Sequence, residues 1–389
     1  MRFLMFLMYL QALEAATYYV APGGSDANIG TVTQPWASIS RAVSIAAPGD
    51  AIILRDGVYG PEGSPTGFSV SINRAGTPNS WIVLKAEHKW GAILDCQPPG
   101  VLSPACNGYF YLDSGAAYWV IQDLVVQNGL NFGISANSTP AAHDILIQGC
   151  RFQYIGRRSN SSVYGEAGVY VGPGSTNFTF DSNVLHDIGR TAGVHLFNDH
   201  GLYLHSSGTT IVNNIFYAPI SGWAVQTSEG FSGMIANNTF ALPMQNNGGH
   251  IMLWQTNSAV TIRNNIFYKP AGGIAVNHSG LIISDGCSVD HNVITGAVAG
   301  SPPGCSVSSN VEADAGMVNA RTGPYDFHLL TGSPAIDEGV PMPSITVDFD
   351  GVSRPQGTAP CAGAFEYSSA AAKGFAPPRA AKAAAKSAN

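Results

Sequence analysis

The chain has 389 residues and a formal net charge of −7; only 11% of its residues are charged, whereas 45 are glycine. Long amphipathic helices would need more Glu, Lys and Arg on their wet faces, so this composition favours an all-β chain with many turns. The negative balance, without a basic patch interleaved with aromatic residues, argues against a nucleic-acid partner.

The first residues are typical of an export signal. One basic residue precedes an apolar run from Phe3 to Leu13, and the small residues Ala15 and Ala16 follow it. The run is too short to span a bilayer. The alternative to a signal peptide is a buried N-terminal strand. We therefore assign residues 1–16 to a signal peptide. We expect a secreted protein, extracellular or periplasmic, without a membrane span.

The next segment predicts a short helix followed by a turn and a strand. Ile39, Ala42, Val43 and Ala46 are apolar at helical spacing, and a Pro-Gly-Asp turn comes directly after them. An open stack of strands must have its ends covered. We expect this helix to cap the N-terminal end of the fold.

The middle of the chain is a repeat whose units share a pattern of one apolar residue, two variable residues and then Asn. The fourth positions of the units are Cys150, Asn183, Asn214, Asn238, Asn265 and Asn292, with Asn310 and Asp123 extending the column. A period in the twenties with strand-like units predicts a solenoid. Asn repeated at one position predicts an internal ladder of side-chain amides along the stack, so we expect this column to be structural.

A second column consists of Gly followed by alternating apolar residues, which is typical of a half-buried strand. The alternation predicts that Leu202 and Leu204 point inward and that Tyr203 and His205 point outward. Aligning the units gives two outward rows: Tyr170, Tyr203, Ala224, Met252 and Ala275, then His205, Gln226, Trp254 and Asn277.

Four of the six cysteines bracket turn-rich loops. Cys96 and Cys106 flank one such loop, and Cys287 and Cys305 flank another. We predict these two pairs as disulfides, which an oxidising compartment permits. Cys150 belongs to the Asn column, so we expect it to be buried and unpaired.

The two ends of the solenoid carry a family resemblance. The stretch YYVAPGGSDANIGTVTQPWASISRAVSIAAPGDAIILRDGVY resembles the N-terminal module of family-nine pectate lyases, and DFHLLTGSPAIDEGV with DFDGVSRP and GAFEY resembles a choice-of-anchor module. This implies an all-β, right-handed parallel β-helix of the pectate-lyase-like superfamily. It would comprise residues 17–310 with an N-terminal cap, then 311–367 as the last coil and a closing segment. Residues 368–389 form a low-complexity tail.

Ionisable residues are densest on the coil between Asn183 and Ser206. Elimination from a uronate needs a group that neutralises the carboxylate, a base for the C5 proton and an acid for the leaving oxygen. Arg190, His200 or His205, and Tyr203 could fill these roles. The catalytic candidates are His200, His205, Arg190, Tyr203, Asp199 and His195. The substrate-binding candidates are Glu166, Tyr170, Gln226, His250 and Trp254.

These residues predict a secreted lyase that cleaves an acidic, uronate-containing polysaccharide, as a monomer. The alternatives are a glycoside hydrolase using Glu166 and Asp199, a uronan epimerase, and a non-catalytic glycan-binding protein. The Asp-rich calcium cluster and the catalytic Lys of family-nine lyases are absent from the sequence. We therefore predict no metal site and no cofactor, with Ca²⁺ as the alternative means of neutralising the carboxylate.

Overall fold

The computed structural model describes ten stretches of the chain. They are residues 15–63, 67–98, 106–157, 165–192, 196–217, 219–241, 249–269, 273, 275–296 and 302–368. These residues form stacked parallel strands with a single α-helix among them, as predicted. None of the helices in these stretches is long and apolar enough to cross a membrane.

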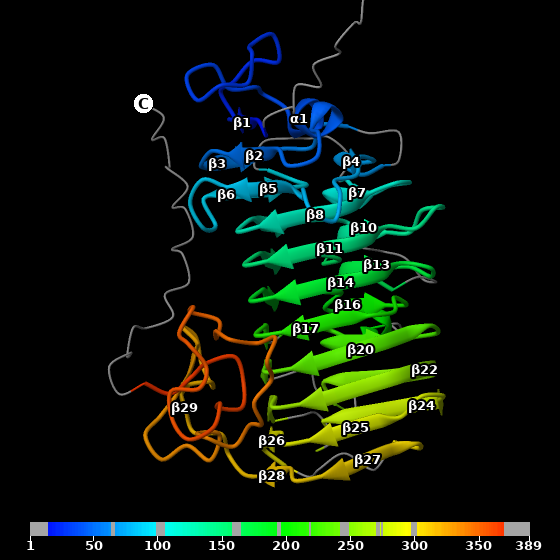
Figure 1. Ribbon diagram of the computed structural model, residues 1–389, viewed down its shortest axis with the longest axis vertical. Coiled ribbons are helices and arrows are strands. Elements are labelled where there is room, and N and C mark those ends of the chain that lie inside the picture. The colour runs from blue at the N-terminus through cyan, green and yellow to red at the C-terminus, as the bar shows by residue number, and fades with distance from the viewer. Residues whose placement is uncertain are drawn as a thin grey trace, which may run out of the picture.

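The chain winds through three stacks of parallel strands (Figure 1). The first stack contains β4 (Val70–Ile72), β7 (Phe110–Leu112), β10 (Phe132–Ala136), β13 (Ala167–Val171), β16 (His200–Leu204), β19 (Val225–Thr227), the start of β22 (Ile251–Arg263) and β24 (Val276–Ile283). The second contains β1 (Thr17–Val20), β2 (Ala51–Leu54), β5 (Ile82–Ala86), β8 (Ala117–Gln122), β11 (His143–Gln148), β14 (Thr176–Asp181), β17 (Thr209–Val212), β20 (Phe231–Ala236), the end of β22, β25 (Cys287–Asp290) and β27 (Cys305–Ser308). Because β22 is long, it joins these two stacks into one 18-stranded sheet.

The third stack is a separate 10-stranded sheet. It contains β3 (Gly57–Tyr59), β6 (Ala92–Asp95), β9 (Val125–Gln127), β12 (Arg151–Gln153), β15 (Val184–His186), β18 (Ile215–Tyr217), β21 (Thr239–Ala241), β23 (Ile266–Tyr268), β26 (Val293–Ile294) and β28 (Val311–Glu312). Apolar side chains from all three stacks point inward and form one continuous core along the solenoid.

Helix α1 (Ile39–Ile45) lies at the N-terminal end of the stack, as predicted (Figure 1). Its N-cap is Ser38, whose hydroxyl accepts a hydrogen bond from the Arg41 amide at 3.3 Å. The helix buries Ile39, Ala42 and Val43, the residues that carry the helical spacing. It therefore covers the apolar end that an open solenoid would expose.

The Asn column forms the predicted internal ladder. The amide of each Asn donates to the side-chain oxygen of the next, at distances of 2.8 to 3.0 Å from Asn183 through Asn310. Each side-chain oxygen also accepts a backbone N–H of the preceding coil, so these buried polar groups are satisfied. The placement of Asp123 in this column was wrong: Leu124 pairs with Cys150 there, and Asp123 is one residue early.

The paired asparagines have separate duties. In Asn213-Asn214, Asn237-Asn238 and Asn264-Asn265 the first residue takes a positive φ of 53 to 56° and the second joins the ladder. Asn tolerates the left-handed region better than most residues. The first Asn therefore turns the chain from the second stack into the third in these three coils.

Both predicted disulfides are present, Cys96–Cys106 and Cys287–Cys305. Cys150 is buried and free, as predicted. Burial raises the pKa of its thiol to about 12, so it behaves as an inert core residue.

The segment after β28 lies along the side of the solenoid (Figure 1). It begins with the antiparallel pair β29 (Met317–Asn319) and β30 (Asp326–Leu329). Phe327, Phe349 and Phe365 pack with outward residues of the third stack. Side chains of the turn asparagines Asn213 and Asn237 donate to its backbone carbonyls, at 3.2 and 3.1 Å.

Candidate functional site

Aromatic side chains follow the outer face of the first stack. They are Phe68, Tyr111, Phe132, Tyr170, Tyr203 and His205, and we call this set the aromatic face. Neighbouring ring centroids are 4.8 to 6.4 Å apart. Tyr170 lies between the buried Val169 and Val171, so strand alternation turns it outward. Flat apolar rings in a row suit stacking against the faces of sugar rings.

The register of the outward rows differs from the prediction. Tyr170 pairs with Tyr203, which pairs with Gln226, Met252 and Asn277 on the following strands. Ala224 and Ala275, which we placed in this row, lie two residues earlier. The predicted alignment was right for Tyr203 and Met252 and wrong at β19 and β24, because it counted from Gly222 and Gly273, which lie further from their strands than Gly201 does from its row.

Tyr203 and His205 lie side by side, with ring centroids 4.8 Å apart, and both are partly exposed. Burial raises the pKa of Tyr203, against hydrogen bonds with the side chains of Ser228 and Gln226. Burial lowers the pKa of His205, against a smaller raising effect of Glu229. At neutral pH this leaves a phenol that can donate a proton beside an uncharged imidazole that can accept one.

Gln226 is buried and reaches the Tyr203 hydroxyl, so it orients that group. Ser228 does the same from the next turn. The sequence did not single out Ser228 or Glu229. Both follow β19, whose pairing with β16 becomes clear only once the register is known.

Arg190 and Asp199, two of the predicted catalytic residues, form a buried ion pair. The guanidinium Nε donates to Oδ2 of Asp199 at 2.9 Å and Nη2 donates to Oδ1 at 2.6 Å. Asp199 also accepts the backbone N–H groups of Arg190 and Glu166, at 2.8 and 3.1 Å. Hydrogen bonding to Asp199 raises the pKa of Arg190. These bonds close the turn that leads into β16, so neither group is available to a substrate.

His200 and His250 are also buried. The Nδ1 atom of His200 accepts the Trp223 amide at 3.3 Å, and burial lowers its pKa to about 3. His250 packs against Phe240 and Phe267 in the core, and burial likewise lowers its pKa to about 3. Both imidazoles are uncharged at neutral pH and inaccessible. The structure therefore offers no support for either as a catalytic or substrate-binding residue.

The remaining predicted residues have three different placements. Glu166 is completely buried next to Asp199. Trp254 is 39% exposed on β22, two strands beyond His205, at about 4.8 Å per strand. His195 lies outside the described residues. Of the eleven predicted site residues, Tyr170, Tyr203, His205 and Gln226 are brought together.

The aromatic face does not supply the ligands that Ca²⁺ needs. This ion takes about six to eight oxygen ligands, mostly carboxylates and carbonyls. Glu229 is the one described carboxylate that acts on both Tyr203 and His205. A cluster of two carboxylates and one histidine is exposed near the N-terminal end, away from Tyr203 and His205. It consists of Asp56, Glu87 and His88. These residues do not fit a calcium-dependent mechanism at Tyr203.

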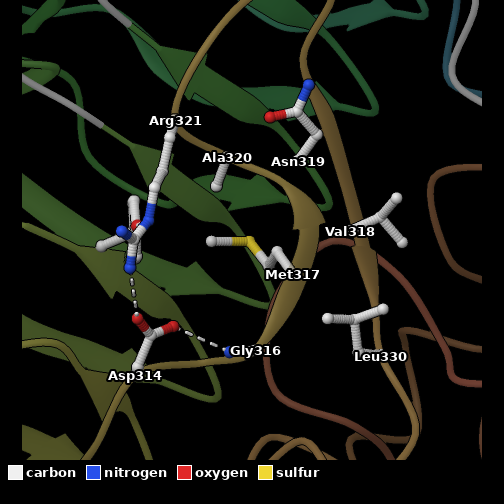
Figure 2. A pocket seen from close by; sticks show the side chains of 9 residues that line it. Asp314, Gly316, Met317, Val318, Asn319, Ala320, Arg321 and Leu330 are labelled. Carbon is white, nitrogen blue, oxygen red and sulfur yellow. Dashed lines mark hydrogen bonds and ion pairs between the residues drawn. The ribbon is translucent and has the colours of Figure 1, made fainter.

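A pocket of about 320 Å³ lies elsewhere, where β29 meets the third stack (Figure 2). Arg321 spans it, donating to the Tyr268 hydroxyl at 3.1 Å and pairing with Asp314 at 3.7 Å. Met317 projects into its centre. Its walls contain no residue of the aromatic face.

The stacked coils define a parallel β-helix, a single solenoid with one capping helix. Residues 18–286 match the family model of Pel9A-like, right-handed β-helix regions, and the chain belongs to that family. This confirms the predicted handedness and the resemblance of the N-terminal module.

Curated relatives match over shorter stretches. The chain is 33% identical to pectate lyase PEL9 of Emericella nidulans over 171 residues, which cover 41% of this chain and 40% of that protein. It is 30% identical to pectate lyase L of Dickeya chrysanthemi over 110 residues, 28% of this chain and 25% of that protein. The matches thus span less than half the length of either relative.

Among solved structures, pectate lyase Pel9A superposes with a TM-score of 0.54 and 16% identity, covering 91% of this chain and 96% of that one. A glycoside hydrolase superposes with a TM-score of 0.53 and 10% identity, over 76% of this chain and 97% of that one. At these identities the superpositions show a common fold and no common activity.

Proposed function

We propose that this protein is an exported lyase that cleaves a uronate-containing polysaccharide by β-elimination on the aromatic face. One observation carries the proposal: an acid–base pair, Tyr203 and His205, lies partly exposed within a row of aromatic rings. The similarity to two pectate lyases supports a glycan substrate. The apolar N-terminal run and the two disulfides support export.

The two side chains divide the reaction between them. The neutral His205 imidazole removes the C5 proton of the uronate, and the electrons form the C4–C5 double bond as the C4–O bond breaks. The Tyr203 hydroxyl donates its proton to the departing O4, which leaves as an alcohol. Gln226 and Ser228 hold the phenol in position through their hydrogen bonds to it.

The charges around this pair favour a substrate whose carboxyl group is esterified at the cleavage site. Between β7 and β22, the described strands of the first stack and their flanking turns carry two basic side chains, Arg157 and Arg190. Arg157 pairs with Asp187, and Arg190 pairs with Asp199. Among the described residues of this region, a free carboxylate would thus meet no uncommitted arginine or lysine, and Glu229 would repel it. An ester needs no neutralising cation, because its carbonyl already makes the C5 proton acidic. This departs from the acidic substrate predicted from the sequence.

The alternative function, glycoside hydrolysis, was predicted to use two carboxylates that are not accessible to a substrate. Glu166 and Asp199 are both completely buried, and Asp199 is bound to Arg190. Hydrolysis normally requires two carboxyl groups flanking the bond.

We also propose that residues 311–367 form a module of the choice-of-anchor type, which their sequence resembles.

A substrate comparison tests the proposal. Purified protein is mixed with highly methyl-esterified pectin, polygalacturonate and alginate, each with Ca²⁺ and with a chelator. We expect ultraviolet absorbance from an unsaturated product with esterified pectin, unaffected by the chelator. New reducing ends without that absorbance would mean hydrolysis. Binding without either signal would mean a glycan-binding protein, and both results would refute the lyase.

A further inference from the structure

The outer face of the third stack carries a buried guanidinium that nothing in the described chain neutralises. Arg151, on β12, is 4% exposed, yet its Nε and Nη2 atoms have no hydrogen-bond partner. Among the described residues, no carboxylate lies within ion-pair distance of it. The guanidinium makes a cation–π contact with Trp90: its central carbon lies 4.0 Å from the centroid of the Trp90 ring.

Arg190 shows what these two atoms do when a carboxylate is present. Its Nε and Nη2 atoms each hold one oxygen of Asp199, at 2.9 and 2.6 Å. Arg151 presents the same edge of the guanidinium, which matches two oxygens of a planar carboxylate. Arg263 and Arg354 also have an Nε without a hydrogen-bond partner, but each is paired with an acid through another nitrogen.

The groups around Arg151 do not supply a carboxylate partner for its guanidinium. Asp187, an acid that follows the neighbouring strand β15, is already bound by Arg157 and by His186, at 2.7 Å from the His186 Nδ1. The groups that act electrostatically on Arg151 are the phenols of Tyr217 and Tyr154. Tyr154 is 45% exposed, so the edge of this cluster faces solvent. Phenolic hydroxyls can donate to the same anion.

An uncompensated charge is costly to bury. Burial lowers the pKa of the Arg151 guanidinium, but an arginine side chain stays protonated at neutral pH, so the charge remains. The cation–π contact with Trp90 offsets part of this cost. A bound anion would offset the remainder.

We propose that Arg151 holds a small oxyanion, with a carboxylate as its best geometric match, at the seam between the third stack and the C-terminal segment. The site lies at this seam because Trp90 packs with the cluster formed by that segment. The Tyr217 ring packs in a tilted arrangement against Tyr325 and Phe327 of the same segment, with ring centroids 5.1 and 5.6 Å apart. The bound anion stabilises the docking of the segment. The proposal is independent of the activity proposed for the aromatic face.

Thermal unfolding with added anions tests this site. Sodium acetate, sodium galacturonate and sodium sulfate are each titrated at constant ionic strength, with sodium chloride as the balance. We expect a saturable rise of the unfolding midpoint, largest for the two carboxylates. Sulfate acting more strongly than acetate would keep the oxyanion site and change its preferred ligand. No saturable rise with any of the three would overturn the proposal.

Variants of Arg151 make the test specific. In Arg151→Met the response to acetate is lost, and the midpoint in anion-poor buffer equals or exceeds that of the wild type, because the buried charge is gone. In Arg151→Lys acetate binds about tenfold more weakly, since the charge stays and the two-atom edge is lost. The control Arg157→Met removes a charge on the same face that is already paired, and it keeps the acetate response.

A direct binding measurement guards against a variant that fails to fold. Calorimetric titration of the wild-type protein with acetate should show one saturable site per chain. The same titration of Arg157→Met should show that site again. A wild-type titration without saturation, or an Arg151→Met protein that binds acetate as well as the wild type, would refute the assignment.

Discussion

The coil from Asn183 to Ser206 contains two ionisable clusters that look alike in the sequence and differ in the folded protein. Arg190 and Asp199 are buried, and each satisfies the other. Tyr203 and His205 follow Asp199 within six residues. Both are partly exposed on the outer face of the first stack, with their rings in contact. Charge density marked the coil, but burial and hydrogen bonding decide which cluster serves the fold and which can serve chemistry.

The largest effect should come from the exposed cluster. His205→Gln and Tyr203→Phe should each lower the rate of unsaturated-product formation by about 10² to 10⁴, the usual contribution of general acid–base catalysis. The unfolding midpoint should stay unchanged, because both side chains are partly exposed. The matched controls are His88→Gln and Tyr325→Phe, which lie away from the aromatic face and should keep full activity. Equal rates in all four variants would remove the pair from the reaction.

The buried cluster should show the opposite behaviour. Arg190→Met leaves Asp199 uncompensated and should cost about 3–5 kcal/mol of unfolding free energy in a urea titration. The double variant Arg190→Met with Asp199→Leu should recover much of that loss, since no charge is then left unpaired. A single variant that keeps its stability and loses its activity would return Arg190 to the catalytic set.

The Asn ladder offers a smaller structural effect with an internal control. Asn238→Leu removes a buried amide that bonds to both neighbouring coils, and should cost about 1–3 kcal/mol. Asn310→Leu changes the last member of the same ladder, which is partly exposed and has a partner on one side only. Its cost in a urea titration should be clearly lower. Equal costs would mean that the ladder does not act through its buried bonds.

The smallest effect concerns the pH dependence of the C-terminal segment. Although burial opposes the charged form, hydrogen bonds to Asp350 and Asp326 raise the pKa of His328. A raised folded pKa adds stability that is complete below the unfolded value, about 6.5, and is lost as pH rises through the folded value. Hydrogen exchange in residues 326–349 should therefore accelerate above that pH. In His328→Asn this acceleration, corrected for intrinsic exchange, should be absent.

Residues that obey the repeat were predictable from the sequence. The ladder from Asn183 to Asn310, the capping helix and both disulfides follow from period, spacing and turn chemistry, which are local properties. Register across strands was not, because at β19 and β24 the predicted Ala224 and Ala275 lie two residues before the true members of the outward row. That shift separates Gln226 from the predicted Ala224.

Burial of polar residues was the second limit of the sequence. Nothing in the string around His200 or His250 distinguishes a buried imidazole from an exposed one, since both stand beside the Gly that opens a strand. Likewise Arg151 was not singled out, because its isolation depends on which carboxylates fold near it. A binding site can depend on a side chain that has no partner within the protein. Only the folded structure shows which partners are missing.

The most direct test of the central claim is a crystal structure of the His205→Gln variant with a methyl-esterified galacturonate oligosaccharide. The account predicts sugar rings stacked along Tyr170 and Tyr203, with the C5 carbon of one unit beside residue 205 and its O4 facing the Tyr203 hydroxyl. An oligosaccharide bound on the second or third stack, or on the first stack away from Tyr203, would contradict it.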